Sequence, residues 1–278
     1  MEGYLGIYSD GTVAEPPPID PPMSVEMDED PEESSPTFEP FKDLCKQRFL
    51  WYFPSYIATI DEAAKKHAVD ENFKQMPFEG ASNTMPGKFD YPDLRRRLIL
   101  IRQVLEQETA RWADQGAVSV RRDQPFADNL RRQYLHLIEE FKKNELVTID
   151  ISLEQNDNPF VWLLTYFGRP MTQLDGGMFQ IRLSISPRFP EEQPRVKFLT
   201  KLFHHRIGTD GTLVYFPKRS GELQSHIDGI IEAIEEENPP YDPRTLVNLE
   251  ASKLFWGSPD DKKLYNRQLR RSVQRSVE

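Results

Sequence analysis

Cysteine is nearly absent from this 278-residue chain, which contains only Cys45. A single cysteine excludes an internal disulfide framework and any metal site built from cysteines. Cys45 falls on the apolar face of an expected helix, where we predict a buried and inert thiol. The loop over 73–91 has neither a phosphate-cradling pattern nor metal-ligand spacing. We therefore expect no cofactor and no bound metal.

Long apolar runs are missing as well. No window approaches the roughly 18 consecutive apolar residues that a membrane-spanning helix needs. The first eleven residues, MEGYLGIYSDG, lack the basic and apolar blocks of a signal peptide. The sequence therefore predicts a protein without a membrane span, located in the cytoplasm or the nucleus.

Basic residues are absent from the first 36 positions, which hold ten acidic residues and seven prolines. The other 242 residues carry 35 acidic and 35 basic residues, so the net charge of -10 belongs to this segment. Such a composition cannot bury enough apolar surface to offset chain entropy. We predict that residues 1–36 are a disordered tail, either solubilising or an acidic docking arm. The chain has no excess of basic residues, so its charge does not indicate nucleic-acid binding.

Residues 37–121 have the pattern of a helical extension. Apolar side chains recur at helical spacing in its first part, and Pro54 is expected to break or kink the run: these are Phe41, Leu44, Cys45, Phe49, Tyr52 and Phe53. The run over 49–53 is apolar all round, which predicts packing against the downstream domain or a partner. A second helix is expected from Pro92, capped by Asp90 and ending at Gly116.

Residues 122–278 alternate between strand and helix patterns. The expected strands cover 146–153, 160–167 and 180–186 and resume at Val196, because apolar and polar residues alternate there. The expected helices, read from apolar stripes at helical spacing, cover 130–141, 227–234, 246–256 and 259–273. This order predicts an α+β domain.

Motifs within this region resemble the core of the ubiquitin-conjugating enzymes. Residues 176–179 read GGMF, residues 189–200 read FPEEQPRVKFLT, and a loop led by His204 closes on an Asp-Gly pair at 210–211. The resemblance runs from about 126 to about 273. It implies the UBC-like fold, with an N-terminal helix, a four-stranded antiparallel sheet and C-terminal helices.

The resemblance also shows a degenerate site. In the family the loop reads His-Pro-Asn, and a cysteine after the glycine carries ubiquitin as a thioester. Here His204 matches the histidine, His205 and Arg206 replace the proline and the asparagine, and Val214 falls on the cysteine. Valine has no nucleophilic atom. We therefore predict that the chain has no catalytic residue at this site and is not an enzyme.

A hydroxyl nucleophile or a metal ion at this site has little support from the sequence. Thr212 and Ser220 carry hydroxyl groups, but a hydroxyl nucleophile needs a positioned base, and the spacing places none. The neighbouring His204 and His205 rarely converge on one metal ion. Two alternatives stay open, namely a divergent ubiquitin-like transferase that uses an unorthodox residue, and a structural subunit held in a complex through the helix at 41–53.

The function that we expect is a binding or scaffold module in ubiquitin or ubiquitin-like pathways. Candidate protein-binding positions lie on the outer face of the sheet, because along each strand they alternate with residues that face the core. These positions are Gln180, Arg182, Ser184 and Lys197. A solvated sheet face would show the same alternation. The expected partners are ubiquitin, a ubiquitin-like modifier or enzymes of these pathways.

Overall fold

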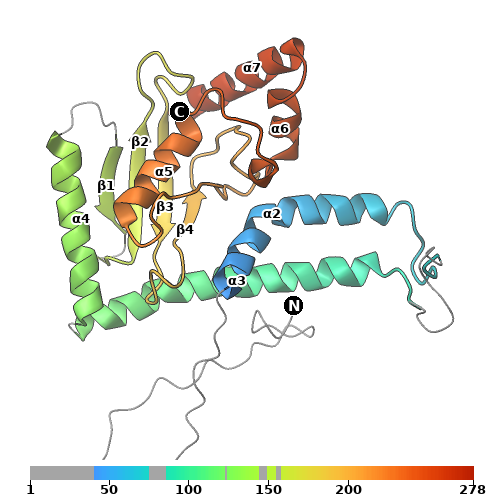
Figure 1. The fold of residues 1–278 in the computed structure, drawn as a ribbon, viewed down its shortest axis with the longest axis horizontal. Helices are drawn as coiled ribbons and strands as arrows, with labels where there is room; N and C mark the ends of the chain where they lie inside the picture. Colours follow the sequence, from blue (N-terminus) through green and yellow to red (C-terminus); the bar gives the residue numbers. More distant parts are fainter. Residues whose placement is uncertain (1–40, 75–85, 123, 144–148, 155–157) are drawn as a thin grey trace, which may run out of the picture.

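The computed structural model describes residues 41–74, 86–122, 124–143, 149–154 and 158–278. Figure 1 shows two long helices lying beside an α+β body. In chain order the elements are α2 (Lys42–Ala63), α3 (Tyr91–Arg121), α4 (Pro125–Lys143), β1 (Ile149–Leu153), β2 (Val161–Phe167), β3 (Met178–Ser184), β4 (Arg195–Phe198), α5 (Leu223–Glu235), the 3-10 helix η1 (Pro243–Thr245), α6 (Leu249–Phe255) and α7 (Pro259–Arg275). The predicted tail over 1–36 lies outside the described residues, and the predicted domain boundaries stay predictions.

The four strands form one antiparallel sheet in the order β1-β2-β3-β4. Ile181 of β3 lies opposite Leu164 of β2 and Phe198 of β4, so the three side chains meet on the same face. This alternation of buried and exposed positions confirms the predicted strands and the α+β class. The strand predicted over 146–153 is described only from Ile149. The strand predicted over 180–186 ends at Ser184, although the Ile185 N–H still donates to the Phe160 carbonyl (2.8 Å).

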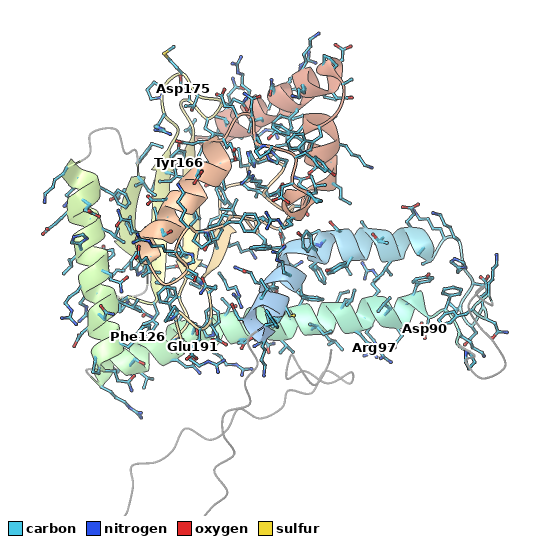
Figure 2. All side chains as sticks on the ribbon, in the orientation of Figure 1. Asp90, Arg97, Phe126, Tyr166, Asp175 and Glu191 are labelled. Atoms are coloured by element: carbon cyan, nitrogen blue, oxygen red, sulfur yellow. The ribbon has the colours of Figure 1, made fainter. Side chains whose placement is uncertain are left out.

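One hydrophobic core lies between the inner face of the sheet and the helices. Figure 1 shows α5 in front of the sheet and α6 and α7 at its far end. The fully buried side chains that fill this core include Trp162, Leu164, Phe179, Ile181, Leu183, Ile227 and Ile230. Tyr166, labelled in Figure 2, hydrogen-bonds through its hydroxyl to the Glu235 carboxylate at the end of α5. The sheet and α5 therefore form one packed unit.

Pro54 lies inside α2, and the helix continues past it to Ala63. Figure 1 shows α2 bent rather than straight, as expected where a proline removes a backbone hydrogen bond. The prediction of a buried Cys45 is wrong, because this thiol is only half-buried. The buried position in this turn belongs to Lys46, whose ammonium pairs with Glu108 of α3 at 2.6 Å. Pairing with α3 places the lysine inward.

Asp90, labelled in Figure 2, caps α3 as predicted, since its carboxylate accepts the Asp93 N–H at 2.9 Å. The prediction that this helix ends at Gly116 is wrong, because α3 continues to Arg121. Gly116 faces the buried ring of Phe160, and a Cβ added there would lie 2.4 Å from ring carbons. The glycine therefore allows a close approach of helix and domain, and it does not stop the helix.

We expect Gly116→Ala to destabilise the protein by about 1–3 kcal/mol, because the new methyl group collides with Phe160. The collision should outweigh the gain of about 1 kcal/mol in helix propensity. Urea unfolding measures the difference. Gly229→Ala in α5 is the matched control, because its nearest neighbour would lie 3.2 Å away and the penalty should be smaller. A higher midpoint for Gly116→Ala than for the parent would contradict the close approach.

Within the described part of the chain, no helix is both long and apolar enough to span a membrane.

Candidate functional site

The loop after β4 places residue 214 through backbone contacts. Gly211 has a φ of +87°, and a Cβ there would lie 2.3 Å from the Phe198 carbonyl oxygen, so the turn requires glycine. Beyond the turn, the Val214 N–H donates to the Arg206 carbonyl at 2.9 Å. The loop thus holds Val214 next to the segment led by His204.

Val214 is completely buried, with 0% of its surface exposed. It forms a small cluster with Trp51 and Val247, and Tyr52 packs against this cluster. Trp51 is 5% exposed and meets the ring of Phe216 edge-on, with centroids 5.8 Å apart. Helix α2 therefore covers the position that the resemblance assigns to the cysteine.

Polar contacts anchor α2 on the domain at both sides of Trp51. Before it, the Asp43 carboxylate pairs with the Arg195 guanidinium of β4 and accepts the Gln193 N–H at 3.0 Å. After it, the Tyr52 hydroxyl donates to the Arg244 carbonyl at 2.6 Å. These contacts fix the position of the helix over the loop.

Helix α3 contributes a second anchor. Arg102 pairs with Asp210 of the loop at 3.0 Å, and both side chains are largely buried. The same guanidinium lies 4.5 Å from the centre of the Phe53 ring in α2. Arg102 thus connects α2, α3 and the loop that carries Val214.

His204 and His205 are buried and held in their neutral forms. Burial lowers the pKa of His204 well below its usual value, and the charge of Arg206, together with any proton taken up by His205, adds to this effect. Its Nδ1 accepts the Arg206 N–H at 3.2 Å. Burial, followed by the charge of Arg206, lowers the pKa of His205 to about 3. The His205 ring stacks on Phe255 with centroids 4.2 Å apart. Both rings are therefore packed inside the domain.

Arg206 directs its charge at Glu236, the residue that follows α5. Its Nη2 lies 2.8 Å from the Glu236 carboxylate, and the side chain is largely buried. A guanidinium that is already neutralised by a carboxylate offers less positive charge to a developing oxyanion than a free one. The three predicted site residues His204, Arg206 and Val214 are thus neighbours, but each is engaged in packing or pairing.

The two hydroxyl candidates differ in surroundings. Thr212 is half-buried, and Ser220 is exposed. The imidazole nearest to Ser220 in the hydrogen-bond network is His226, whose Nε2 donates to the Ser220 carbonyl at 3.0 Å. The other ring nitrogen, Nδ1, accepts from the Tyr215 hydroxyl at 2.8 Å. Both nitrogens are therefore occupied by groups other than the serine hydroxyl.

Sequence reasoning missed His226 and Tyr215. Burial lowers the pKa of His226, although the hydrogen bond to the Ser220 carbonyl opposes this. The position of His226 beside Ile227 and Ile230 on the apolar stripe of α5 was a signal for burial. Its partner Tyr215 lies on a different element, so local spacing could not identify it.

The predicted protein-binding residues lie on the outer face of the sheet, but in two environments. Gln180 and Lys197 are exposed, whereas Arg182 and Ser184 are half-buried. The Arg182 guanidinium pairs with Glu154, to which its Nε donates at 2.7 Å. Their role in binding stays a prediction.

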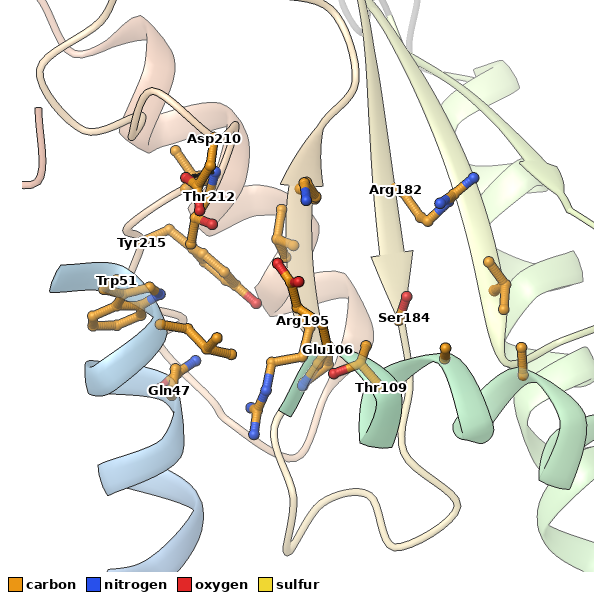
Figure 3. A pocket seen from close by; sticks show the side chains of 18 of the residues that line it. Gln47, Trp51, Glu106, Thr109, Arg182, Ser184, Arg195, Asp210, Thr212 and Tyr215 are labelled. Atoms are coloured by element: carbon orange, nitrogen blue, oxygen red, sulfur yellow. Dashed lines mark hydrogen bonds between the residues drawn. The ribbon is translucent and has the colours of Figure 1, made fainter. Parts of the chain in front are cut away.

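A cleft of about 350 Å³ lies between the two extension helices and this sheet face (Figure 3). Its walls come from α2, α3, β3, β4 and the loop, and its lining includes Gln47, Trp51, Glu106, Thr109, Arg182, Ser184, Arg195, Lys197, Asp210, Thr212 and Tyr215. Three of the four predicted binding residues therefore line one cleft, and Gln180 does not. Among the described residues, no group of three or more His, Cys, Asp or Glu side chains could hold a metal ion.

Comparison with known proteins identifies the region that carries this site. Residues 130–215 match the family described as ubiquitin-conjugating enzyme. Ubiquitin-conjugating enzyme E2 3 of Arabidopsis thaliana is 27% identical over 123 residues, which are 44% of this chain and 80% of that protein. Ubiquitin-conjugating enzyme E2 2 of Saccharomyces cerevisiae is 26% identical, covering 44% of this chain and 70% of that protein. Ubiquitin-conjugating enzyme E2 15 of Schizosaccharomyces pombe is 24% identical over 168 residues, covering 54% and 93%.

The chain therefore contains a ubiquitin-conjugating enzyme-like domain of the UBC fold, preceded by a helical extension. This confirms the family resemblance and the fold predicted from the sequence. The prediction that the chain is not an enzyme is contradicted, since its relatives are named as ubiquitin-conjugating enzymes. The matched stretch itself contains no cysteine, because the single thiol is Cys45 of α2.

Proposed function

We propose that the domain acts as a binding or scaffold module in a ubiquitin or ubiquitin-like pathway, in the cytoplasm or the nucleus. The main support is the packing of Trp51 against Val214. The loop surface at the position of the family's cysteine is thereby covered by the chain's own helix α2. Partners must then be recognised elsewhere. The proposal concerns binding, and it is compatible with transfer chemistry at a residue other than Val214.

The surface that suits a partner is the part of the outer sheet face beyond the cleft. Phe167 and Met178 lie opposite each other on β2 and β3, and both are exposed. Leu199, also exposed, donates its backbone N–H to the Gln180 carbonyl at 2.8 Å. With Lys197 these residues form an apolar patch with a polar rim, which is typical of protein-binding surfaces. Ubiquitin, a ubiquitin-like modifier or a pathway enzyme is the partner that we propose for it.

Replacing Phe167 and Gln180 by alanine should weaken ubiquitin binding about tenfold, because about 1.4 kcal/mol is lost when an anchor at a small interface is truncated. Titration of labelled ubiquitin, followed by NMR, gives the affinity. The control is the double variant Lys218→Ala/Gln224→Ala, which alters exposed residues before and within α5. Figure 1 shows α5 over the other face of the sheet. Absence of any signal change at about 1 mM protein would reject ubiquitin as the partner.

A transferase that uses an unorthodox residue is the second candidate, and the names of the relatives favour it. Incubation of the full chain with activating enzyme, ATP and ubiquitin tests it. An adduct cleaved by reductant would have to lie on Cys45, the only thiol, and Cys45→Ser would abolish it. An adduct cleaved by mild base would indicate a hydroxyl, and Thr212→Val and Ser220→Ala would separate the two candidates. Val214→Ala should leave the yield of either adduct unchanged.

The third hypothesis, a structural subunit docked through residues 41–53, has less support because part of this helix is already buried. Trp51 and Phe53 of this helix are buried within the chain. They are therefore not available as free apolar surface while α2 stays on the domain.

A further inference from the structure

Helix α7 has two sides of opposite character. It buries Tyr265, Leu269 and Val273 against the core. On its opposite side, exposed basic residues recur three and four positions apart, and in a helix such positions lie in one row. This basic stripe consists of Lys263, Arg267, Arg270, Arg271 and Arg275, all exposed.

The stripe lacks compensating acids. Lys263 pairs with Asp260 at 2.9 Å, but in the described part of the chain no carboxylate pairs with Arg267, Arg270, Arg271 or Arg275. Residues 262–277 contain no acidic residue at all. Like charges four positions apart destabilise a helix. The helix dipole favours basic residues only in the last turn, so it does not account for Arg267.

The counter-charge lies elsewhere in the same chain. Residues 26–33 read EMDEDPEE and hold six acids in eight positions. We propose that the basic stripe of α7 binds this acidic segment of the same chain. The charges of the two segments are complementary. A segment tethered by a linker that spans the two sites is present at an effective concentration in the millimolar range, which a separate partner rarely reaches.

Nucleic acid offers the same kind of charge to arginine, but the rest of the molecule disfavours it. The chain has a net charge of -10, and residues 37–278 are balanced in charge. A polyanion would therefore meet net electrostatic repulsion from the chain as a whole. The acidic segment itself meets no such barrier.

NMR of the full-length chain tests the proposal through three variants. The stripe variant is Arg267→Gln/Arg270→Gln/Arg271→Gln, and the acid variant is Asp28→Asn/Glu29→Gln/Asp30→Asn. The matched control is Arg95→Gln/Arg96→Gln/Arg97→Gln, which removes the same charge from α3, where these arginines already pair with Asp61 and Asp93. Amide signals of residues 26–33 report on the stripe variant, and amide signals of α7 report on the acid variant.

At about 50 mM salt we expect the stripe variant to shift the signals of 26–33 and the acid variant to shift those of α7. Raising the salt of the parent protein to about 500 mM should reproduce both shifts, because screening weakens exposed ion pairs. Cleavage within 26–33 by a glutamate-specific protease should become about fivefold faster in the stripe variant, as expected for losing a few exposed charge pairs. The control should change neither readout.

Three results would overturn the proposal. The signals of 26–33 could be the same in the parent and in the stripe variant. The shifts could depend on protein concentration, which would assign the acidic segment to a second copy. Lastly, a short DNA duplex could shift the α7 signals in the parent protein while the acid variant leaves them unchanged, which would make the stripe a phosphate-binding surface.

Discussion

Trp51→Ala should lower the stability of the contact between α2 and the domain by about 3–5 kcal/mol, the usual range for removing a buried aromatic side chain. Trp51 fills the space above Val214 and Val247 and contacts Phe216, so its removal leaves a cavity at the centre of this contact. The ion pair of Asp43 with Arg195 would remain. A loss of this size should allow α2 to leave the loop while the core around the sheet stays folded.

Exposure of residue 214 reports this opening directly. In a Cys45→Ser background, Val214→Cys places the only thiol of the chain beneath Trp51. We expect slow reaction of this thiol with a labelling reagent, and at least about a hundredfold faster reaction after Trp51→Ala, because each 1.4 kcal/mol corresponds to a factor of ten. Leu44→Ala, at a position of α2 that is 43% exposed, is the control and should leave the rate unchanged. Equal rates with and without Trp51 would show that α2 does not cover this position.

Acidification should destabilise the folded protein at a pH where few carboxylates have yet titrated. Burial lowers the pKa of His204, His205 and His226, and His205 falls to about 3. In the unfolded chain these rings take up protons near pH 6.5, whereas the folded protein resists protonation. Stability is therefore complete above about pH 6.5 and falls as the pH is lowered toward the folded pKa values. Each histidine contributes about 1.4 kcal/mol per pH unit over its window.

Urea unfolding between about pH 7.5 and pH 4.5 measures this dependence. His205→Phe keeps an aromatic ring against Phe255 but removes the titrating group, so its pH dependence should be shallower by about 1.4 kcal/mol per pH unit. If His205→Phe had the parent slope, the ring would not be held neutral by burial.

The elements of the domain follow from local patterns, and most of them could be predicted from the sequence. Alternation identified β2 and β3, because their side chains point in turn to the core and away from it. Asp90 before Pro92 marked the beginning of α3, since a capping carboxylate and a proline suit a helix N-terminus. Gly116 was misread as a helix end, because its reason for being glycine is Phe160, which lies 44 positions away.

The candidate site was likewise predicted only in part from the sequence. The identities of Val214 and Arg206 and their neighbourhood follow from the motif around His204. The partners of these residues do not, because Glu236 and Trp51 approach from other elements. Cys45 shows the same limit, since helical spacing predicted it to be buried, whereas in the structure Lys46 is buried and paired with Glu108 and Cys45 is half-buried.

By itself, the sequence determined the strand and helix order, the acidic character of the first 36 residues, and the absence of a thiol at position 214. These properties depend on residue type and on periods of two or 3.6 residues, which neighbouring positions reveal. Only the tertiary structure decided that α2 lies over Val214, that α3 and α2 cover part of the outer sheet face, and that the basic side of α7 stays exposed. These depend on burial of apolar surface and pairing of charges between distant segments, which no local period encodes.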